Sequence, residues 1–320
     1  MECFGKFPYE ATPQVPRFNP YQCPCYPVAC CAYCGRYAGF NPRVVTPYNC
    51  NSGYYPPQKN SLPEICGNRR SMQPRTNNLV GRAVYGEYPW TGAILDTANS
   101  YLGGCVLINK RTALTAAHKI ADYTNTPLKV RFGFLNGKLI DDNTKEYNVQ
   151  TITIHPNYDR TTFKSDIAIL KFSEDITYSS VIGPVCLPNT ENLIVGSQKC
   201  CWVSGWGQDK FTDGMYQSVQ KSVQVPIVDT NSCERQLQST QLGQGFTLDR
   251  NSFICAGGNL NEDACTGDGG SPLVCELTTG QWTVVGLVSW GVGCGQPKIP
   301  GVYVNVAHFL PWIQSQNNIR

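Results

Sequence analysis

The sequence has no long apolar run and little charge of either sign. No stretch of this 320-residue chain approaches the roughly 18 consecutive apolar residues that a membrane helix needs. Only 15% of the residues are charged and the net charge is +3, with no basic run or stripe. We therefore expect neither a membrane span nor a nucleic-acid partner. A chain of this length can form one large or two smaller domains.

Histidine is also scarce, whereas cysteine is abundant. With three histidines and without two spaced C-x-x-C pairs, a zinc site is a poor explanation for the 17 cysteines. A reducing cytosol would leave most of these cysteines as free thiols, so a secreted, extracellular protein is favoured. The odd count leaves at least one cysteine unpaired or linked to another chain. The start, MECFGKFPYE, has no apolar core, so the signal peptide expected of a secreted protein is not present here.

The N-terminal part of the chain differs in composition from the rest. Residues 1–66 contain 8 of the 17 cysteines and 11 of the 22 prolines. Because proline at this density disfavours long helices and central strands, this region is either ordered by disulfides or a largely disordered arm with local crosslinks. Residues 67–78, GNRRSMQPRTNN, follow as a polar, basic linker. Its arginines, Arg69, Arg70 and Arg75, are expected to be exposed to trypsin-like proteases.

From residue 79 to residue 320 the pattern changes to short β-rich runs between turn signals. Examples are TGAIL, LKVRFGFL, YNVQTITI, CCWVSGWG and WTVVGLVSW. Such spacing is typical of an all-β barrel or sandwich. One amphipathic helix is expected near the end, around VAHFLPWIQSQNN. We therefore expect residues 79–320 to form a β-rich domain.

Three short motifs place reactive positions in a recognisable order within this domain. LTAAHKI places His118 after an apolar strand, KSDIAIL places Asp166 just before one, and GDGGSP follows Cys265. Base, orienting acid and nucleophile position occur in this order in chymotrypsin-type hydrolases. Here, however, Gly269 stands where the reactive serine is required.

Further motifs follow in order and at similar spacing, and residues 79–320 resemble a trypsin/chymotrypsin-family serine protease domain. These motifs are GEYPW, HPNYDR, VCLP, GWG, ICAG, SWG and PGVYVNV. The resemblance implies an all-β fold of two packed, six-stranded antiparallel barrels with a C-terminal helix. The small, disulfide-rich N-terminal region would be added to this domain.

The resemblance also implies a role for each matched catalytic position. His118 would be the general base, and Asp166 would hold its tautomer and orientation. The backbone N–H groups of Gly267 and Gly269 would face a developing oxyanion. Because loss of the serine alone costs about 10⁶-fold in kcat in a related mechanism, we expect a pseudo-protease, with only a remnant of the triad.

A specificity pocket is implied beside these positions. Asp263 lies six residues before Gly269, where trypsin-like relatives have a carboxylate at the base of the pocket. Gly291 and Gly301 match the small residues that keep the pocket open, and Ser289 begins the edge segment that pairs with a substrate. Such a pocket would accept Arg or Lys.

Ser271 offers an alternative nucleophile if the register is shifted. The ten-residue separation of Cys265 and Cys275 equals that of active relatives, so nothing has been inserted or deleted. Ser271 then falls on a later glycine position and is not expected beside His118. An engineered serine-to-glycine trap is a further alternative, but other departures from the family pattern make it less favoured.

The cysteines carry one of these departures. The resemblance implies four disulfides: Cys66–Cys186, Cys201–Cys275, Cys233–Cys255 and Cys265–Cys294. The usual bridge beside the catalytic histidine is missing, because Gly103 and Lys119 stand at its two positions. Closing a loop of about 16 residues typically contributes ~3 kcal/mol, so another interaction must compensate. Cys105 and Cys200 are extra, and their pairing stays open.

The activation site is a second departure. Active relatives are cut after a basic residue, and the new ammonium pairs with the aspartate before the nucleophile. Here the matching LVGR, residues 79–82, follows Asn78 rather than arginine. Because a buried, unpaired carboxylate is costly, we expect a zymogen-like or rearranged pocket around Asp268, which weakens the expectation that Asp263 binds a basic side chain.

The departures together resemble the catalytically inactive serine protease homologues of arthropods, the clip-domain and masquerade-like group of prophenoloxidase-activating-factor type. This resemblance implies an extracellular cofactor or adaptor in the cascade that activates prophenoloxidase for melanisation. Its partners would be prophenoloxidase or the activating proteases. A microbial-surface recognition, antimicrobial or clotting-associated binding protein is the alternative, and an active hydrolase by another route is a third. CYPVACC, residues 25–31, resembles the end of a clip module, so residues 1–66 could be a divergent or truncated clip module.

No cofactor is implied, and calcium is the only metal to weigh. Asp141, Asp142 and Glu146 in the segment FGFLNGKLIDDNTKE could supply oxygen ligands. Phe134 stands where calcium-binding relatives usually have a glutamate. We therefore expect a solvated loop rather than a calcium site.

Overall fold

The computed structural model of the chain describes the trypsin-like region and the short segment that joins it through Cys66. The described residues are 66–69, 81–137, 141–188, 200–209, 213–260, 262–278 and 281–317. The predictions about residues 1–65, the rest of the linker and the Asn78 junction lie outside these residues.

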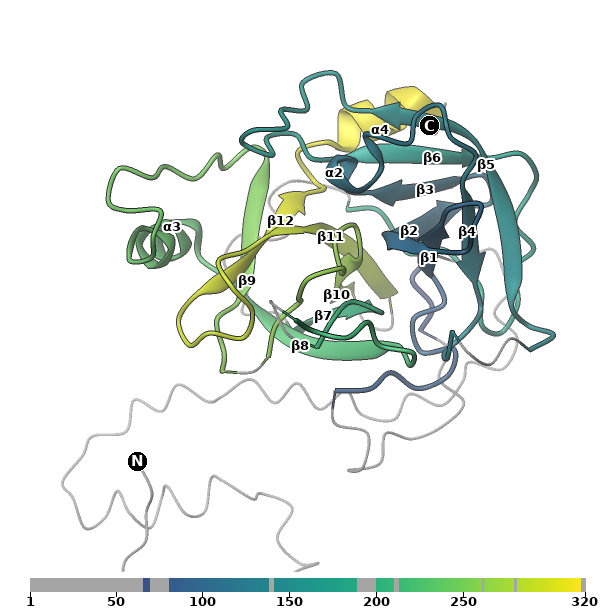
Figure 1. Ribbon diagram of the computed structural model, residues 1–320, viewed down its shortest axis with the longest axis horizontal. Coiled ribbons are helices and arrows are strands. Elements are labelled where there is room, and N and C mark those ends of the chain that lie inside the picture. The colour runs from purple at the N-terminus through teal and green to yellow at the C-terminus, as the bar shows by residue number, and fades with distance from the viewer. Residues whose placement is uncertain are drawn as a thin grey trace, which may run out of the picture. The chain divides into compact units, whose positions relative to one another are not determined.

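Six antiparallel strands in the described part of the chain close into a first barrel, in the order β1-β2-β3-β6-β5-β4 (Figure 1). They are β1 (Thr91–Leu95), β2 (Tyr101–Asn109), β3 (Thr112–Thr115), β4 (Lys129–Phe132), β5 (Lys145–Ile154) and β6 (Ala168–Phe172). In β4 the side chains of Val130 and Phe132 are buried, whereas those of Lys129 and Arg131 are not. This alternation follows from the two-residue period of a strand with one face on the core.

A second closed barrel has the order β10-β11-β12-β9-β8-β7 within the described residues. Its strands are β7 (Cys200–Gly205), β8 (Lys221–Val228), β9 (Phe253–Gly257), β10 (Pro272–Thr278), β11 (Gln281–Trp290) and β12 (Pro300–Asn305). Between β8 and β9, α3 (Thr230–Gln238) begins after Asp229, whose side chain accepts a hydrogen bond from the backbone of Ser232. This is the N-cap that a helix start favours.

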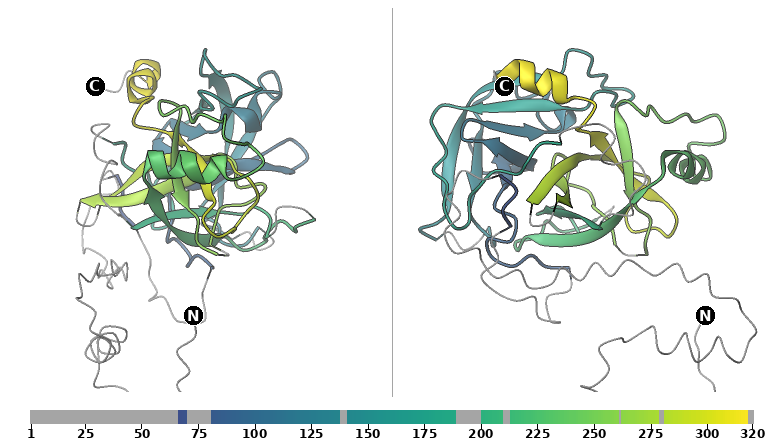
Figure 2. Two further views of the ribbon diagram at one scale, coloured as in Figure 1. Left: turned by 90° about the vertical axis from the view of Figure 1, so that its left-hand side faces the viewer. Right: turned by 180° about the vertical axis from the view of Figure 1, so that it is seen from behind.

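The last helix returns to the first barrel. After β12 the chain forms α4 (Leu310–Asn317), which lies beside the first barrel in both views of Figure 2. Lys171 of β6 donates a hydrogen bond of 2.7 Å to the carbonyl of Gln316, and the His155 ring packs 4.8 Å from that of Trp312. The expected two barrels and C-terminal helix are confirmed, and the helix ties the end of the chain to the opposite barrel.

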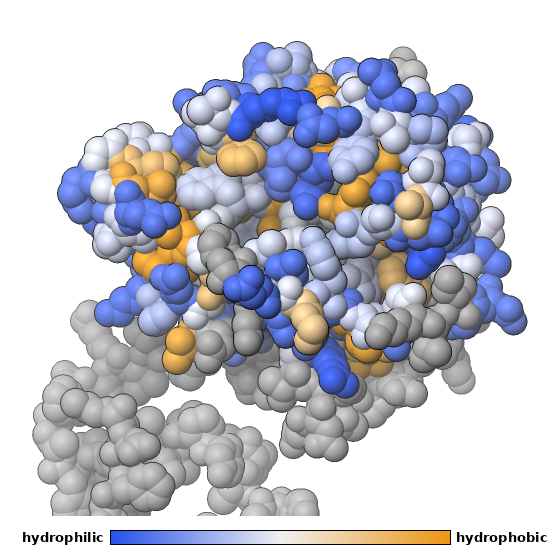
Figure 3. Space-filling model, in the orientation of Figure 1, coloured by the Kyte–Doolittle hydropathy of each residue, from blue (hydrophilic) through white to orange (hydrophobic). Residues whose placement is uncertain are grey.

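One face of the described part of the molecule is mainly polar. Figure 3 shows a largely hydrophilic face with a few apolar patches. Among the described residues, the exposed large apolar side chains are Met215, Tyr216, Leu242 and Leu260. Within the same residues, no helix is long and apolar enough to cross a membrane.

Four disulfides lie within the described residues. They are Cys66–Cys186, Cys201–Cys275, Cys233–Cys255 and Cys265–Cys294, the same pairs that the family resemblance implied. Cys105 is a free thiol buried in the first barrel, and burial raises its pKa. The side chain of Cys200 is not among those described.

The expectation that Arg69 is exposed is wrong. Its guanidinium forms an ion pair with the buried Glu87, and its side chain is only 13% exposed. The same guanidinium lies 4.8 Å from the ring centroid of Trp282 and 5.0 Å from that of Tyr88. Next to it, the backbone N–H of Trp282 donates to the carbonyl of Gly67. Charge and aromatic contacts therefore hold residues 66–69 on the domain, although their composition is that of a linker.

Candidate functional site

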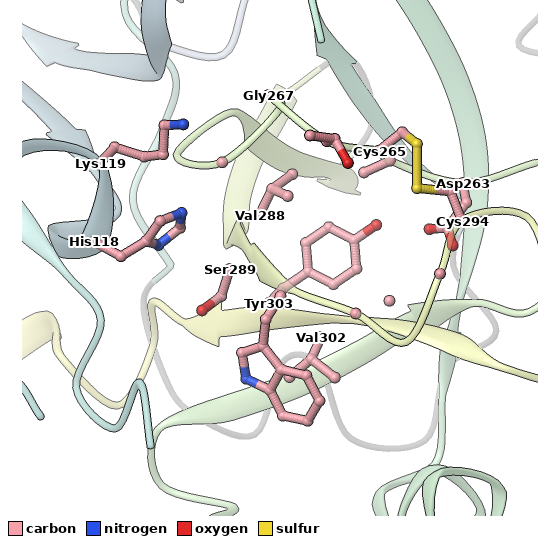
Figure 4. Close-up of a pocket in the computed structure, with 17 residues that line it drawn as sticks. His118, Lys119, Asp263, Cys265, Gly267, Val288, Ser289, Cys294, Val302 and Tyr303 are labelled. Atoms are coloured by element: carbon pink, nitrogen blue, oxygen red, sulfur yellow. A yellow bond between two sulfur atoms is a disulfide. The ribbon is translucent and has the colours of Figure 1, made fainter. Parts of the chain in front are cut away.

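Residues from both barrels meet at the predicted site. His118 lies in α2 (Ala117–Ile120), which follows β3, and Asp166 lies just before β6. Asp263 and Gly269 come from the loop between β9 and β10 of the second barrel. Figure 4 shows His118 and Lys119 at one end of a pocket and Asp263 beside the Cys265–Cys294 disulfide at the other.

The base and its orienting acid have the geometry of a catalytic pair. His118 Nδ1 lies 2.7 Å from Asp166 Oδ2, and the His118 backbone N–H donates to Asp166 Oδ1 at 2.8 Å. Ser289 Oγ donates to the same carboxylate at 2.6 Å. Ser289, expected only as a pocket edge, therefore also holds Asp166. Because the acid holds Nδ1–H, the other ring nitrogen of His118 faces the nucleophile position.

Position 269 faces this free nitrogen. A Cβ built on Gly269 would lie 2.7 Å from His118 Nε2. A side chain at this position would therefore point at the imidazole, as that of a reactive serine does. Ser271 lies elsewhere: a Cβ built on Gly104 would be 2.1 Å from Ser271 Oγ, and the hydroxyl is buried. The shifted register is thus at odds with the geometry, because Ser271 packs against the strand that contains Gly104.

Lys119 fills the space left by two lost groups. A Cβ built on Gly269 would lie 2.7 Å from Lys119 Cδ, and one built on Gly103 would lie 2.7 Å from Lys119 Cε. The lysine stem therefore covers both the nucleophile position and the position of the missing cysteine. This packing replaces part of what the disulfide would have contributed. Burial lowers the pKa of the Lys119 amine, while the carboxylates of Asp268 and Asp166 act in the opposite direction.

The two amides of the remnant oxyanion site are available for a ligand. Neighbouring amides are used internally, since the N–H of Asp268 donates to the Cys265 carbonyl and that of Gly270 to the Val288 carbonyl. By contrast, the N–H groups of Gly267 and Gly269 have no acceptor among the described residues. Both glycines line the pocket. Preorganised donors of this kind stabilise negative charge on a bound group.

The pocket between these amides and Asp263 has a volume of about 310 Å³. At its base, Asp263 Oδ2 accepts a hydrogen bond of 3.1 Å from the Gly295 backbone, whereas Oδ1 is buried without a hydrogen-bond partner among the described residues. The hydroxyl of Tyr303 is equally buried and unpartnered. A Cβ on Gly301 would approach Oδ1 to 3.0 Å, so glycine keeps the base open. Burial raises the pKa of Asp263 to about 6.

Asp268 is enclosed by protein. Its carboxylate accepts hydrogen bonds from the backbone N–H groups of Gly207 at 2.8 Å and of Cys265 at 3.0 Å. A Cβ on Gly207 or on Gly205 would lie within 2.5 Å of this carboxyl group, which explains both glycines of the GWG motif. Burial raises the pKa of Asp268 to about 6. The pocket beside it is open. The expectation of a zymogen-like or rearranged pocket stays a prediction, because the Asn78 junction lies outside the described residues.

Two of the three carboxylates of the candidate calcium segment, those of Asp141 and Glu146, are engaged with protein donors. Asp141 accepts a hydrogen bond of 2.7 Å from the Tyr85 hydroxyl, and Glu146 pairs with Lys129 at 2.7 Å and Arg131 at 2.6 Å. Among the described residues, no group of three or more His, Cys, Asp or Glu side chains is arranged to hold a metal.

Two residues of the site were not assigned a role from sequence. Lys119 was recognised only as a replaced cysteine, and Tyr303 only as part of the PGVYVNV motif. The joint loss of both cysteines of one bridge, with the smaller glycine at position 103 and the larger lysine at position 119, is the signal that could have indicated the lysine. No local signal marks Tyr303, because its hydroxyl reaches the pocket from within β12.

The burial of Asp263 predicts a pH-dependent stability difference. Because the folded-state pKa is about 6 and the reference value is 3.8, the ionised carboxyl destabilises the folded state, and this penalty develops as the pH rises from about 4 to 6. Asp263→Asn should therefore be more stable than the wild type by about 2–3 kcal/mol at pH 7.5 and by almost nothing at pH 4. Urea unfolding at the two pH values measures this difference.

The exposed Asp142 provides the control. Asp142→Asn should change the free energy of unfolding by no more than about 0.5 kcal/mol at either pH. An Asp263→Asn difference that is the same at pH 4 and pH 7.5 would contradict the buried charge at the pocket base.

Known proteins share this architecture and much of its sequence. The trypsin family model matches residues 80–313. The chain is 42% identical over 285 residues to inactive CLIP domain-containing serine protease A3 of Aedes aegypti, covering 86% of this chain and 58% of that protein. It is 40% identical over 258 residues to phenoloxidase-activating factor 2 of Galleria mellonella, covering 74% of this chain and 82% of that protein.

A third relative has a similar name. The chain is 37% identical over 243 residues to inactive CLIP domain-containing serine protease A8 of Anopheles gambiae, covering 73% of this chain and 65% of that protein. The chain thus spans less than two thirds of the length of the Aedes and Anopheles proteins. The family match covers most of the chain, and three relatives agree with it. The chain therefore belongs to the trypsin family, among the inactive CLIP-domain serine protease homologues.

Proposed function

We propose that this protein is a non-catalytic cofactor or adaptor in an extracellular proteolytic cascade that activates prophenoloxidase. It would dock on prophenoloxidase or on an activating protease without cutting either. The observation that carries the proposal is Gly269, which faces His118 Nε2 and supplies no attacking atom. A related enzyme that loses its serine loses about 10⁶-fold in kcat, equivalent to roughly 8 kcal/mol of barrier.

The intact surroundings of Gly269 support a binding role. The His118–Asp166 pair, the oxyanion amides and the pocket are formed although the nucleophile is missing. Asp263 is ionisable and buried at the pocket base, an arrangement that lowers stability unless a ligand uses it. A domain kept only as a structural scaffold would gain stability by losing this charge.

The names of the relatives support a role of this protein in the cascade. One is a phenoloxidase-activating factor and others are inactive CLIP-domain proteases. By analogy with them, we propose a secreted protein whose partners belong to that cascade. The candidate recognition of microbial surfaces has no specific observation in its favour, so it enters as an outcome of the test below.

Restoring the serine tests the loss of catalysis. The wild type should not cleave an Arg-p-nitroanilide. Gly269→Ser alone should gain little, because the new Cβ lies 2.7 Å from both His118 Nε2 and Lys119 Cδ. Gly269→Ser with Lys119→Ala should be at least about tenfold more active than the single variant. Removing the lysine stem relieves this overlap and lets the serine take its reactive position.

Initial rates of p-nitroaniline release measure all three proteins, with unfolding curves to show that each is folded. Wild-type turnover as fast as that of the double variant would contradict the pseudo-protease assignment. Equal rates for the single and double variants would show that Lys119 does not obstruct the restored serine.

A reconstituted cascade tests the cofactor role. The full chain is added to purified activating protease and prophenoloxidase, and phenoloxidase activity is followed over time. We expect the activity to rise with the amount of added protein, and the reduced and alkylated protein to have no effect. Unchanged activity would contradict the proposal, and sedimentation of the same protein with bacterial cells would then favour surface recognition.

A further inference from the structure

Three sets of polar groups in the pocket lack partners among the described residues. Asp263 Oδ1 and the Tyr303 hydroxyl lie at the base, and the N–H groups of Gly267 and Gly269 lie near the nucleophile position. The Lys119 ammonium forms no ion pair or hydrogen bond within the same residues, although its side chain lines the pocket. One end of the pocket thus offers negative charge and the other offers donors and positive charge.

We propose that this pocket binds the free C-terminus of a polypeptide that ends in Arg or Lys. The basic side chain would pair with Asp263, and the terminal carboxylate would be held by the oxyanion amides and Lys119. The inference rests on the proposed function, because such C-termini are produced when a trypsin-like protease cuts a partner. The protein would then recognise a cleaved partner and not its uncut form.

The base of the pocket fits a cationic side chain. Asp263 Oδ1 and the Tyr303 hydroxyl are both buried, and Gly301 leaves the space in front of them open. A guanidinium or ammonium group would supply the missing donors to Oδ1. Hydrogen bonds between charged partners are roughly twice as strong as neutral ones. The same interaction would remove the destabilisation that the buried carboxylate causes in the empty pocket.

The opposite end fits a carboxylate better than a peptide carbonyl. The amides of Gly267 and Gly269 can donate to one oxygen, and Lys119 can pair with the other. His118 adds a donor only as imidazolium, because in the neutral ring Nδ1–H is directed to Asp166.

Lys119 is the reason to expect a chain end. Its stem packs on Gly269 and Gly103, at the end of the pocket opposite Asp263 (Figure 4). A peptide that continued past the bound Arg would bring a neutral amide to this end and leave the partly buried ammonium unpaired. A terminal carboxylate would instead neutralise it. Charge complementarity of this kind gives specificity because mismatched groups stay desolvated without a partner.

Matched peptides test the proposal. A fluorescently labelled hexapeptide ending in Arg is prepared as the free acid and as the C-terminal amide, and a third peptide ends in norleucine as the free acid. Fluorescence anisotropy measures binding to the full-length wild type. We expect the Arg acid to bind at least about tenfold more tightly than the Arg amide or the norleucine acid, as the loss of one charged hydrogen bond requires.

Variants assign each end of the peptide. Lys119→Met should lower the affinity for the Arg acid to that for the Arg amide, and it should leave the affinity for the amide unchanged. Asp263→Asn should weaken both Arg peptides. Lys145→Met, at an exposed lysine of β5 outside the pocket, is the matched control and should leave all three affinities unchanged. Unfolding curves establish that each variant is folded.

The wild-type measurements alone can overturn the proposal. Equal affinity for the Arg acid and the Arg amide would show that the pocket does not recognise a chain end, and failure to bind either would show that it takes no basic peptide. If Lys119→Met still bound the Arg acid more tightly than the Arg amide, the lysine would not be part of the carboxylate site. Selective binding of the Arg acid by a protein without effect on the cascade would support this site while contradicting the proposed function.

Discussion

Asp166 is the group on which the arrangement of the site depends. Its buried carboxylate accepts two hydrogen bonds from His118 in the first barrel and one from Ser289 in the second. A buried carboxylate is tolerated only when its oxygens are satisfied, so these contacts fix the imidazole and join the two barrels across the site. The nucleophile position is opposite the free nitrogen of that imidazole. The structure therefore retains the orientation of a catalytic centre although the reactive atom is absent.

The charged groups around this centre differ in how far protein hydrogen bonds compensate for their burial. Asp166 is satisfied by protein donors, which stabilise the local fold. Asp268 also accepts two backbone hydrogen bonds, but burial still raises its pKa to about 6. Asp263 and Lys119 are desolvated without a full set of partners. Burial raises the pKa of Asp263 and lowers that of Lys119, which means that burial disfavours the charged form of each. Such groups lower stability in the empty pocket and become useful when a ligand of opposite charge is bound.

The sequence was sufficient for the fold, and it named His118, Asp166 and Gly269, which the structure brings together. The two barrels were implied by the resemblance to the trypsin family. Short alternating strands predicted an all-β barrel or sandwich, because strand period and turn residues are local properties. The exposure of Arg69 was predicted wrongly for the same reason. Its polar neighbours are typical of a linker, whereas Glu87, Tyr88 and Trp282, which surround its guanidinium, are distant in sequence.

Distances within the site could not be read from spacing. The Gly103 and Lys119 substitutions showed that a disulfide was missing, but not that the lysine stem would cover Gly269. Likewise, the motif around Tyr303 indicated a strand and not an unpartnered hydroxyl inside the pocket. These features depend on how two barrels pack against each other, which a local pattern does not determine.

We infer that the pocket keeps its affinity for a cation after the loss of catalysis. Calorimetric titration of the wild type with benzamidine, a planar amidinium of a size suited to the Asp263 end, tests it most directly. We expect one benzamidine molecule to bind per chain, and we expect this binding to be lost in Asp263→Asn. A folded wild type that binds no benzamidine, or binds it equally well without the Asp263 charge, would contradict this inference.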